Sequence, residues 1–331
     1  MEDLRRVILA GDIGGTSTRL AVFHLDGGQW KPLAVHVYSS RAHESLHQIV
    51  TERFREGDRP VRRACFGVAG PVRRGRSETP NLPWVVDARR LAEALGLKTV
   101  HLINDLEANA YGIAALGPED FAVLNEGDPE PTGNAALISA GTGLGEAGLR
   151  WRDGRHEPFP SEGGHADFAP RNEVEIELLR YLLREFGHAS YERVLSGPGL
   201  RTISRCLRDT GRGEDTAGVA ERMREEDPAA VISEAALEGR CGLCAKAMDL
   251  FVSVYGAEAG NLALKVLASG GVFLGGGIAP KILPKLKEPA FLEAFTAKGR
   301  MRGLLEAVPV RVILNDQAAL LGAARFAALH G

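Results

Sequence analysis

The sequence predicts an α/β protein built from two similar halves. Apolar strands alternate with helical segments along the chain, which is the pattern of α/β folds. An apolar strand, a glycine-rich reversal and a second strand occupy residues 7–23, and the same arrangement returns in residues 136–151. This repeat predicts a duplicated fold in which a phosphate-binding loop from each half faces a shared cleft.

Hydrophobic periodicity and capping residues place the elements of the first half. We expect strands over residues 7–10, 20–23, 30–39, 64–71 (ending in a turn) and 99–103, and helices over 45–55, 88–95 and 106–116. Asp87 is the expected N-cap of the second helix, and Gly96 its end.

The second half is predicted to become more helical after its own glycine-rich loop. Strands are expected over 136–140, 148–151, 272–274 and 310–314, and helices over 173–186, within 233–267 and up to about residue 329. The highly charged segment 208–227 is expected to be a mobile or surface helical excursion.

Composition excludes several classes of protein. The chain has 331 residues and a net charge of −3, which gives no support for nucleic-acid binding as its main role. We expect no signal peptide and no membrane partner, because the N-terminus leads directly into a strand and no apolar run approaches the ~18 residues of a membrane span. Four cysteines are too few for a disulfide framework, so a cytoplasmic location is predicted. Cys241 and Cys244 have the spacing of half a zinc site, but no second pair accompanies them, which favours core or groove thiols.

The first glycine-rich loop, Asp12-Ile-Gly-Gly-Thr-Ser-Thr-Arg, has the composition of an anion site. A tight reversal between strands exposes several backbone N–H groups on one side. Gly14 and Gly15 suit it because glycine tolerates positive φ and lets a phosphate approach the backbone. Thr16 adds a hydroxyl donor, and Asp12 could bind Mg²⁺ through water. The alternative is an ordinary hairpin.

Neither this loop nor the second one, Gly141-Thr-Gly-Leu-Gly, matches a familiar nucleotide fingerprint. A P-loop is excluded because no G-x-x-x-x-G-K-[ST] is present, and no G-x-G-x-x-G opens a helix as in a dinucleotide-binding site. Strand, glycine-rich turn and strand form a different phosphate cradle.

Four other groups of residues could carry chemistry. Asn104 and Asp105 follow a strand, where a carboxylate could accept a hydroxyl proton during phosphoryl transfer, although a helix N-cap explains them equally well. Glu162 and His165 enclose two glycines and could bind a polyol. Glu192 could instead belong to a surface helix, and the Gly275-Gly-Gly turn could be a plain strand-to-helix turn or a surface for a flat base.

Taken together, these motifs resemble the bacterial ATP-dependent glucokinase family of the hexokinase, Hsp70 and actin-like ATPase superfamily. The resemblance covers residues 7–325 in the expected order, through the segments Asp12–Arg19, Leu102–Ala108, Gly141–Gly145, Glu162–Pro170, Glu192–Leu200 and Leu274–Lys281.

The resemblance implies a role for each of these residues. Asp105 would be the catalytic base that deprotonates the 6-hydroxyl of glucose. The glucose-binding residues would be Asn81, Asn104, Asp105, Glu162, His165 and Glu192. ATP would be bound by Gly14, Gly15, Thr16, Thr142, Gly143, Gly276 and Gly277, with Asp12 near Mg²⁺.

The resemblance also implies an actin-like ATPase (ribonuclease H-like) fold and a homodimer. Residues 1–115 with 312–331 would form a small α/β domain, and residues 116–311 a large one. Related repressor/kinase-type (ROK) sugar kinases use a histidine in a similar segment to bind zinc with a Cys-rich motif just downstream. No such cysteines follow His165, so zinc is not expected. The alternatives are a kinase for another hexose and a sugar- or ATP-binding sensor without turnover.

Overall fold

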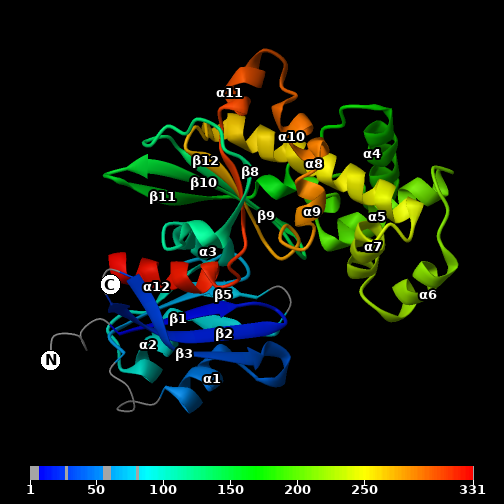
Figure 1. Cartoon of the computed structure of the whole chain (residues 1–331). Coiled ribbons are helices and arrows are strands. Elements are labelled where there is room, and N and C mark those ends of the chain that lie inside the picture. Colours follow the sequence, from blue (N-terminus) through cyan, green and yellow to red (C-terminus); the bar gives the residue numbers. More distant parts are fainter. Residues whose placement is uncertain (1–6, 27–28, 55–60, 80–81, 331) are drawn as a thin grey trace. The chain divides into compact units, whose positions relative to one another are not determined.

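The computed structural model describes residues 7–26, 29–54, 61–79 and 82–330, and two compact units are found in it (Figure 1). Unit 1 consists of Met1–Glu119 with Asn315–Gly331, and unit 2 of Asp120–Leu314. Each unit has its own sheet with a hydrophobic core.

Unit 1 is built on a five-stranded sheet of order β3-β2-β1-β4-β7. Its strands are β1 (Ile8–Ile13), β2 (Ser17–Asp26), β3 (Gln29–Ser39), β4 (Arg63–Val68) and β7 (His101–Asn104). β1, β4 and β7 are parallel, whereas β2 is antiparallel to β1 and β3 is antiparallel to β2. A separate two-stranded sheet joins β5 (Arg76–Glu78) to β6 (Val85–Asp87).

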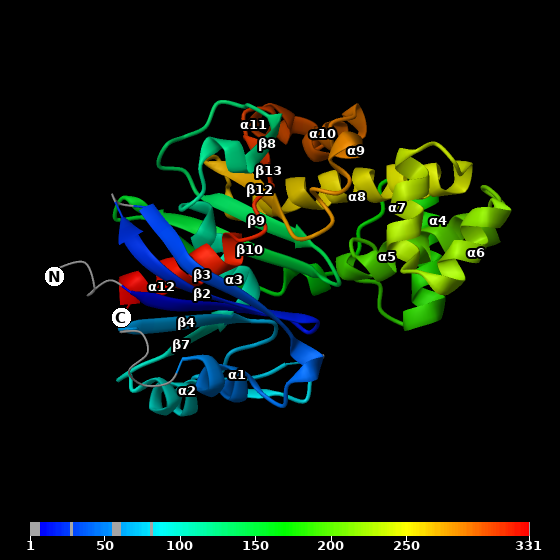
Figure 2. The same cartoon turned by 60° about the horizontal axis from the view of Figure 1, so that its bottom comes forward.

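Helices cover both faces of this sheet, because its central strands are apolar on both sides. Leu9 belongs to a core with α1 (Leu46–Arg53) and α2 (Ala88–Leu95), while Ile8 and Ala10 face a second core with α3 (Asp105–Ile113) and α12 (Ala318–His330). Figures 1 and 2 show these helix pairs on opposite faces. The N- and C-terminal segments therefore complete one unit.

Unit 2 is built on a six-stranded sheet of order β11-β10-β9-β12-β13-β8. Its strands are β8 (Phe121–Asn125), β9 (Ala135–Ala140), β10 (Leu144–Arg152), β11 (Arg155–Ser161), β12 (Gly271–Gly275) and β13 (Val310–Ile313). Its helices are α4 (Glu173–Phe186), α5 (Gly197–Asp209), α6 (Ala217–Glu225), α7 (Pro228–Leu237), α8 (Gly242–Val266), α9 (Leu283–Leu286), α10 (Pro289–Thr296) and α11 (Arg302–Glu306). The long α8 packs against the sheet, where the Tyr255 hydroxyl donates to the Ile138 carbonyl at 3.3 Å.

The two sheets have the same core topology, which confirms the predicted duplication. In unit 2, β9, β12 and β13 are parallel, and β10 and β11 follow β9 as antiparallel neighbours. This repeats the arrangement of β1, β4 and β7 with β2 and β3. β8 is an additional antiparallel edge strand. The fold is therefore a duplicated α/β fold of the actin-like ATPase type.

Local sequence signals identified most helices but fewer edge strands. α2 begins after Asp87, whose carboxylate accepts the Arg89 N–H at 2.9 Å, and ends at Gly96 with a φ of 64°. The strands β5, β6, β8 and β11 were not predicted, because they are short or only partly buried and their alternation is weak. Helix α5 was also missed, although Ser196 caps it and a proline opens it. Among the described residues, no helix combines the length and apolar character that a bilayer crossing demands.

Two glycines let α3 and α12 approach each other closely. A Cβ on Gly112 would overlap the Ala318 carbonyl, and a Cβ on Gly322 would overlap the Ala108 carbonyl. We therefore expect Gly322→Ala to lower the free energy of unfolding by about 1–3 kcal/mol, the usual cost of overpacking a core contact. The measurement is urea unfolding followed by circular dichroism.

Gly303→Ala is the matched control, because Gly303 lies in α11 and a Cβ there would meet no atom within 4 Å. It should leave the stability unchanged or slightly higher, since alanine favours helix over glycine. Equal unfolding midpoints for the two variants would contradict the close α3–α12 packing.

Candidate active site

The first glycine-rich loop of unit 1 joins β1 to β2 and is hydrogen-bonded to Ser40. The buried Ser40 hydroxyl donates to the Gly14 carbonyl at 2.7 Å and lies 3.0 Å from the Thr18 hydroxyl. The Ser40 N–H donates to the Thr16 carbonyl. Thr16 itself is exposed, so its hydroxyl is available to a ligand. Sequence reasoning missed Ser40, because it follows β3, far from the loop in the sequence.

The conformation of this loop corrects one expectation. Neither Gly14 nor Gly15 has a positive φ, so left-handed backbone is not the reason for glycine here. The remaining reason is space, since a loop without β-carbons lets an anion reach the backbone N–H groups.

Asp12 lies at the end of β1, where it faces other charged groups of unit 1. Burial, and after it the charge of the Asp105 carboxylate, raise the pKa of the Asp12 carboxyl to about 6. Arg19 opposes this shift, while Asp316, which pairs with Arg19 at 2.9 Å, adds to it. Asp12 and Asp105 are thus close enough for their negative charges to repel each other. A bound cation would reduce this repulsion.

Asn104 and Asp105 mark the junction between β7 and α3. The side-chain oxygen Oδ1 of Asn104 accepts the Leu106 N–H at 2.9 Å, and its side-chain nitrogen Nδ2 donates to the Gly70 carbonyl at 3.2 Å. Asn104 is therefore the N-cap of α3, as one of the two interpretations predicted. An Asp105 oxygen accepts the same Leu106 N–H at 2.9 Å, which holds the carboxylate at the positive end of the helix.

In unit 2, Glu192 contacts both the second glycine-rich loop and His165, another residue predicted to bind glucose. One carboxylate oxygen accepts the Leu144 N–H at 3.1 Å, and the other lies 3.9 Å from His165 Nδ1. Glu192 lies in the short 3₁₀ helix η5 (Tyr191–Arg193), and His165 in η4 (Gly163–His165). Glu192 thus lies in a short 3₁₀ helix, with its carboxylate hydrogen-bonded to the second loop. Glu162 directly precedes η4.

Gly143 gives Glu192 access to the loop. A Cβ on Gly143 would lie 2.5 Å from a Glu192 carboxylate oxygen. Glycine at this position therefore leaves room for the Glu192 carboxylate.

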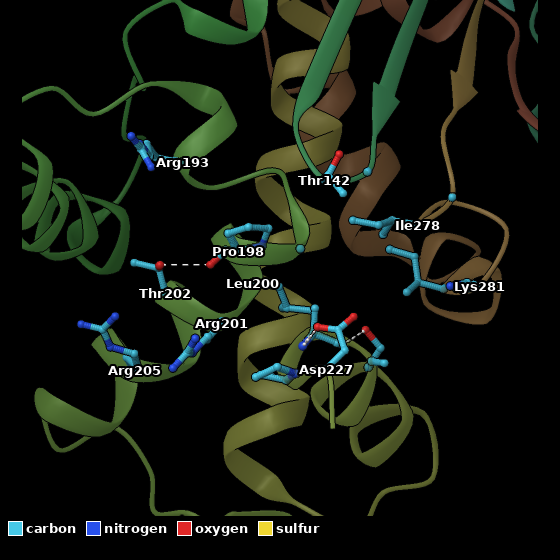
Figure 3. Close-up of a pocket in the computed structure, with 18 of the residues that line it drawn as sticks. Thr142, Arg193, Pro198, Leu200, Arg201, Thr202, Arg205, Asp227, Ile278 and Lys281 are labelled. Atoms are coloured by element: carbon cyan, nitrogen blue, oxygen red, sulfur yellow. Dashed lines mark hydrogen bonds between the residues drawn. The ribbon is translucent and has the colours of Figure 1, made fainter. Parts of the chain in front are cut away.

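A cavity of about 930 Å³ opens in unit 2 beside the second loop (Figure 3). Its walls include the apolar residues Phe186, Leu200, Ile278 and Ile282 and the cationic residues Arg193, Arg201, Arg205 and Lys281. Thr142 and Gly277, two of the residues predicted to bind nucleotide, also line it. The predicted Gly276 adjoins Gly277 in the turn after β12. A volume of this size is typical of a small-molecule or cofactor site.

The first residues of two helices line this cavity, because Gly197 begins α5 and Pro228 begins α7. Arg201 and Arg205 lie one helical turn apart on α5 and both line it. The spacing of four residues between Arg201 and Arg205 is visible in the sequence. Because helix α5 was not predicted, it did not indicate that both side chains line one cavity.

Asn81 lies outside the described residues. The other predicted residues fall into two groups. Unit 1 holds Asp12, Gly14, Gly15, Thr16, Asn104 and Asp105. Unit 2 holds Thr142, Gly143, Glu162, His165, Glu192, Gly276 and Gly277.

Comparison with known proteins identifies the family of this chain. A family model described as Glucokinase matches residues 9–330. A glucokinase from Nostoc punctiforme is 44% identical, with 97% of this chain and 99% of the relative covered. The chain belongs to the glucokinase family. A glucokinase from Synechocystis is 42% identical, with 97% of each chain covered.

A solved structure agrees with this assignment. The crystal structure of a glucokinase from an Antarctic psychrotroph superimposes with a TM-score of 0.83 at 30% identity. The similarity covers 98% of this chain and 99% of the other. The duplicated α/β fold is therefore the fold of the family.

The turn after β12 supplies a test of the cavity's geometry. Gly276 has a φ of 80°, and a Cβ there would overlap the Ala140 carbonyl, whereas a Cβ on Gly277 would meet no atom within 4 Å. Gly276→Ala should therefore destabilise the protein by about 2–4 kcal/mol through overpacking and backbone strain. Differential scanning calorimetry would measure this as a lower Tm.

The adjacent Gly277→Ala substitution is the control and should retain the wild-type Tm. If Gly276→Ala also retained it, the turn would not have the described conformation.

Proposed function

We propose that this chain transfers the γ-phosphoryl group of ATP to the 6-hydroxyl of D-glucose, giving glucose 6-phosphate and ADP. The observation that carries the proposal is membership of the glucokinase family over residues 9–330, with 44% identity to one named glucokinase. Glucokinases use ATP, so the chain is an ATP-dependent kinase that phosphorylates glucose. The roles of individual residues extend this proposal.

The adenosine of ATP is assigned to the cavity in unit 2. Its apolar walls, such as Leu200 and Ile278, suit a flat base, and its volume of about 930 Å³ accommodates a nucleoside. Gly276 and Gly277 would lie near the adenosine, where backbone without side chains allows close approach. Thr142 at the wall of this cavity, with Gly143, would bind the phosphates.

The first glycine-rich loop is assigned to the terminal phosphates. Gly14, Gly15 and Thr16 would donate hydrogen bonds to phosphate oxygens, and Ser40 would keep the loop in shape. Such fixed donors stabilise the charge that develops on the transferred group without having to reorganise.

Magnesium fits the oxygen ligands of this region. Among the described residues, no three or more His, Cys, Asp and Glu side chains form a metal-binding group. Mg²⁺ needs no such group, since it is commonly held by one or two carboxylates, water and substrate phosphates. Asp12, whose pKa is raised by burial, would hold it through water, and the ion would offset phosphate charge. Zinc has no part in the proposal.

Glucose is assigned to Glu162, His165 and Glu192, with Asn104, Asp105 and Asn81. The contact of Glu192 with His165 would orient the imidazole, and the Leu144 N–H would orient Glu192. The amide of Asn104 is already engaged as a helix cap, so its main contribution would be to position Asp105.

Asp105 is assigned the role of general base. Its carboxylate would accept the proton of the 6-hydroxyl as that oxygen attacks phosphorus. The Leu106 N–H at the N-terminus of α3 fixes the direction of the Asp105 carboxylate. Most of the rate enhancement would come from positioning and electrostatics, as in phosphoryl transfer generally.

Two further properties belong to the proposal. A cytoplasmic location agrees with the use of ATP and with four cysteines that are all free thiols. A homodimer is proposed from the family resemblance and can be tested by light scattering.

Asp105→Ala is expected to lower kcat by at least ~10³-fold, the range that loss of a general base and of positioning reach together. Glucose and ATP binding should remain, because Asn104 still caps α3. Stopped assays of ADP release and calorimetric glucose titration would measure the two effects. Near-normal kcat in the variant would remove Asp105 from the role of base.

ADP release from Mg-ATP with a panel of hexoses tests the substrate. We expect turnover with glucose and little with mannose, fructose or N-acetylated sugars. Turnover only with another hexose would overturn glucose as the acceptor, and binding of both ligands without turnover would indicate a sensor.

A further inference from the structure

Two carboxyl groups meet in the interior of unit 2, away from the residues assigned above. Glu146 on β10 is 1% exposed and Glu258 on α8 is 0% exposed. Their carboxyl groups lie within hydrogen-bonding range of each other. Two carboxylates have no hydrogen to share, and burying both as anions is costly. A proton between them would remove both problems.

The surrounding donors indicate which residue carries that proton. Glu258 accepts from Lys265 Nζ at 3.0 Å and from Asn261 Nδ2 at 2.7 Å, so its negative charge is compensated. Glu146 Oε1 has no hydrogen-bond partner in the described part of the chain. Burial and the neighbouring Glu258 raise the pKa of Glu146 to about 7, although Lys265 opposes the shift. A proton on Glu146 would supply the missing hydrogen, with Glu146 as the donor and Glu258 as the acceptor.

Glu146 supports the segment that carries Glu162 and His165. In the sheet it pairs with Ser161, the last residue of β11. A Cβ on Gly163 would overlap Glu146 Oε2, so the carboxyl group packs directly against the backbone of η4. A displacement of this carboxyl group towards η4 would move Gly163, and with it Glu162 and His165, which are assigned to glucose.

Glu258 supports the segment that carries Glu192. The Asn261 amide that donates to Glu258 also donates to the Tyr191 hydroxyl at 3.0 Å. Lys298 Nζ donates to Asn261 Oδ1 at 2.6 Å, and since lysine can only donate, this contact defines which way the amide points. Tyr191 directly precedes Glu192 in η5.

We propose that Glu146 and Glu258 are a positioning pair that shares one proton and holds η4 and η5 in the geometry that binds glucose. This inference deepens the proposed function and rests on it. Neither residue touches the sugar, and both act through the backbone and side chains above them.

The charges around the pair determine what happens when the proton is lost. Lys265 from α8 is the cation in contact with the pair, Tyr191 from η5 is a neutral phenol, and Lys298 reaches it through Asn261. Arg171 lies beyond and is paired with the buried Glu175. Deprotonation would leave two anions against one contacting cation, and their repulsion would push Glu146 towards Gly163.

The expected consequence is a glucose KM that rises with pH while kcat changes little. Neither Glu146 nor Glu258 is assigned to the general base or to the phosphates, so chemistry at saturating glucose should persist. Between about pH 6 and about pH 9 we expect KM to rise three- to tenfold, roughly the effect of loosening one positioning contact.

Glu146→Gln tests the pair, because the amide keeps the shape and the donor but cannot titrate. We expect its glucose KM to stay near the wild-type value at low pH and to lose the rise at high pH. Calorimetric titration of glucose without ATP should show the same difference. The infrared band of a buried protonated carboxyl should be present in the wild type and absent in the variant.

Glu175→Gln is the matched control, since Glu175 is equally buried but is paired with Arg171. It should retain the pH-dependent KM, even if its Tm falls. The inference is overturned if Glu146→Gln keeps the wild-type pH profile, or if the infrared band survives in it. Wild-type protein that neither binds nor phosphorylates glucose would overturn the proposed function itself, together with the inference.

Discussion

The glycine turns and Asp12 and Asp105 depend on one constraint, which is that parallel strands end at a common edge of their sheet. In unit 1, Ile13 pairs with Val68 and Val68 with Asn104, so the ends of β1, β4 and β7 lie side by side. This register brings Asp12 close to Asp105 across about 90 residues of sequence. In unit 2 the pairing of Ser139 with Gly275 does the same for the two glycine turns.

Buried polar groups support the residues assigned to ligands. Ser40 holds the first loop, and Glu192 holds the second. The Glu146–Glu258 pair adds a third such support, below the segments assigned to glucose. Each of these polar groups has little access to water and must form its hydrogen bonds within the protein. This requirement restricts the position of the neighbouring residues that are assigned to ligands.

Glycines provide the space that these contacts need. Gly143 admits the Glu192 carboxylate, Gly163 admits that of Glu146, and Gly276 admits the Ala140 carbonyl. Only Gly276 of these three also needs a positive φ. The glycine-rich character of the motifs therefore reflects close approach of polar groups as much as backbone flexibility.

The sequence by itself determined the fold class, the duplication and most helices, because caps and periodicity are local signals. Asp87 and Gly96 delimited α2, and the periodic apolar residues of α4 predicted its full length. Through the family resemblance of their motifs, it also predicted that Asp105, His165 and Glu192 belong to one site. The residues that produce these signals lie within or next to the element that they define.

Only the tertiary structure decided which distant residues act together. Ser40 and the walls of the cavity come from separate segments, and Glu146 and Glu258 belong to different elements. The edge strands β8 and β11 also became apparent only in the sheet. Strand order and helix packing determine these contacts. Both result from burial of the whole hydrophobic core, which cannot be predicted from a local pattern of residues.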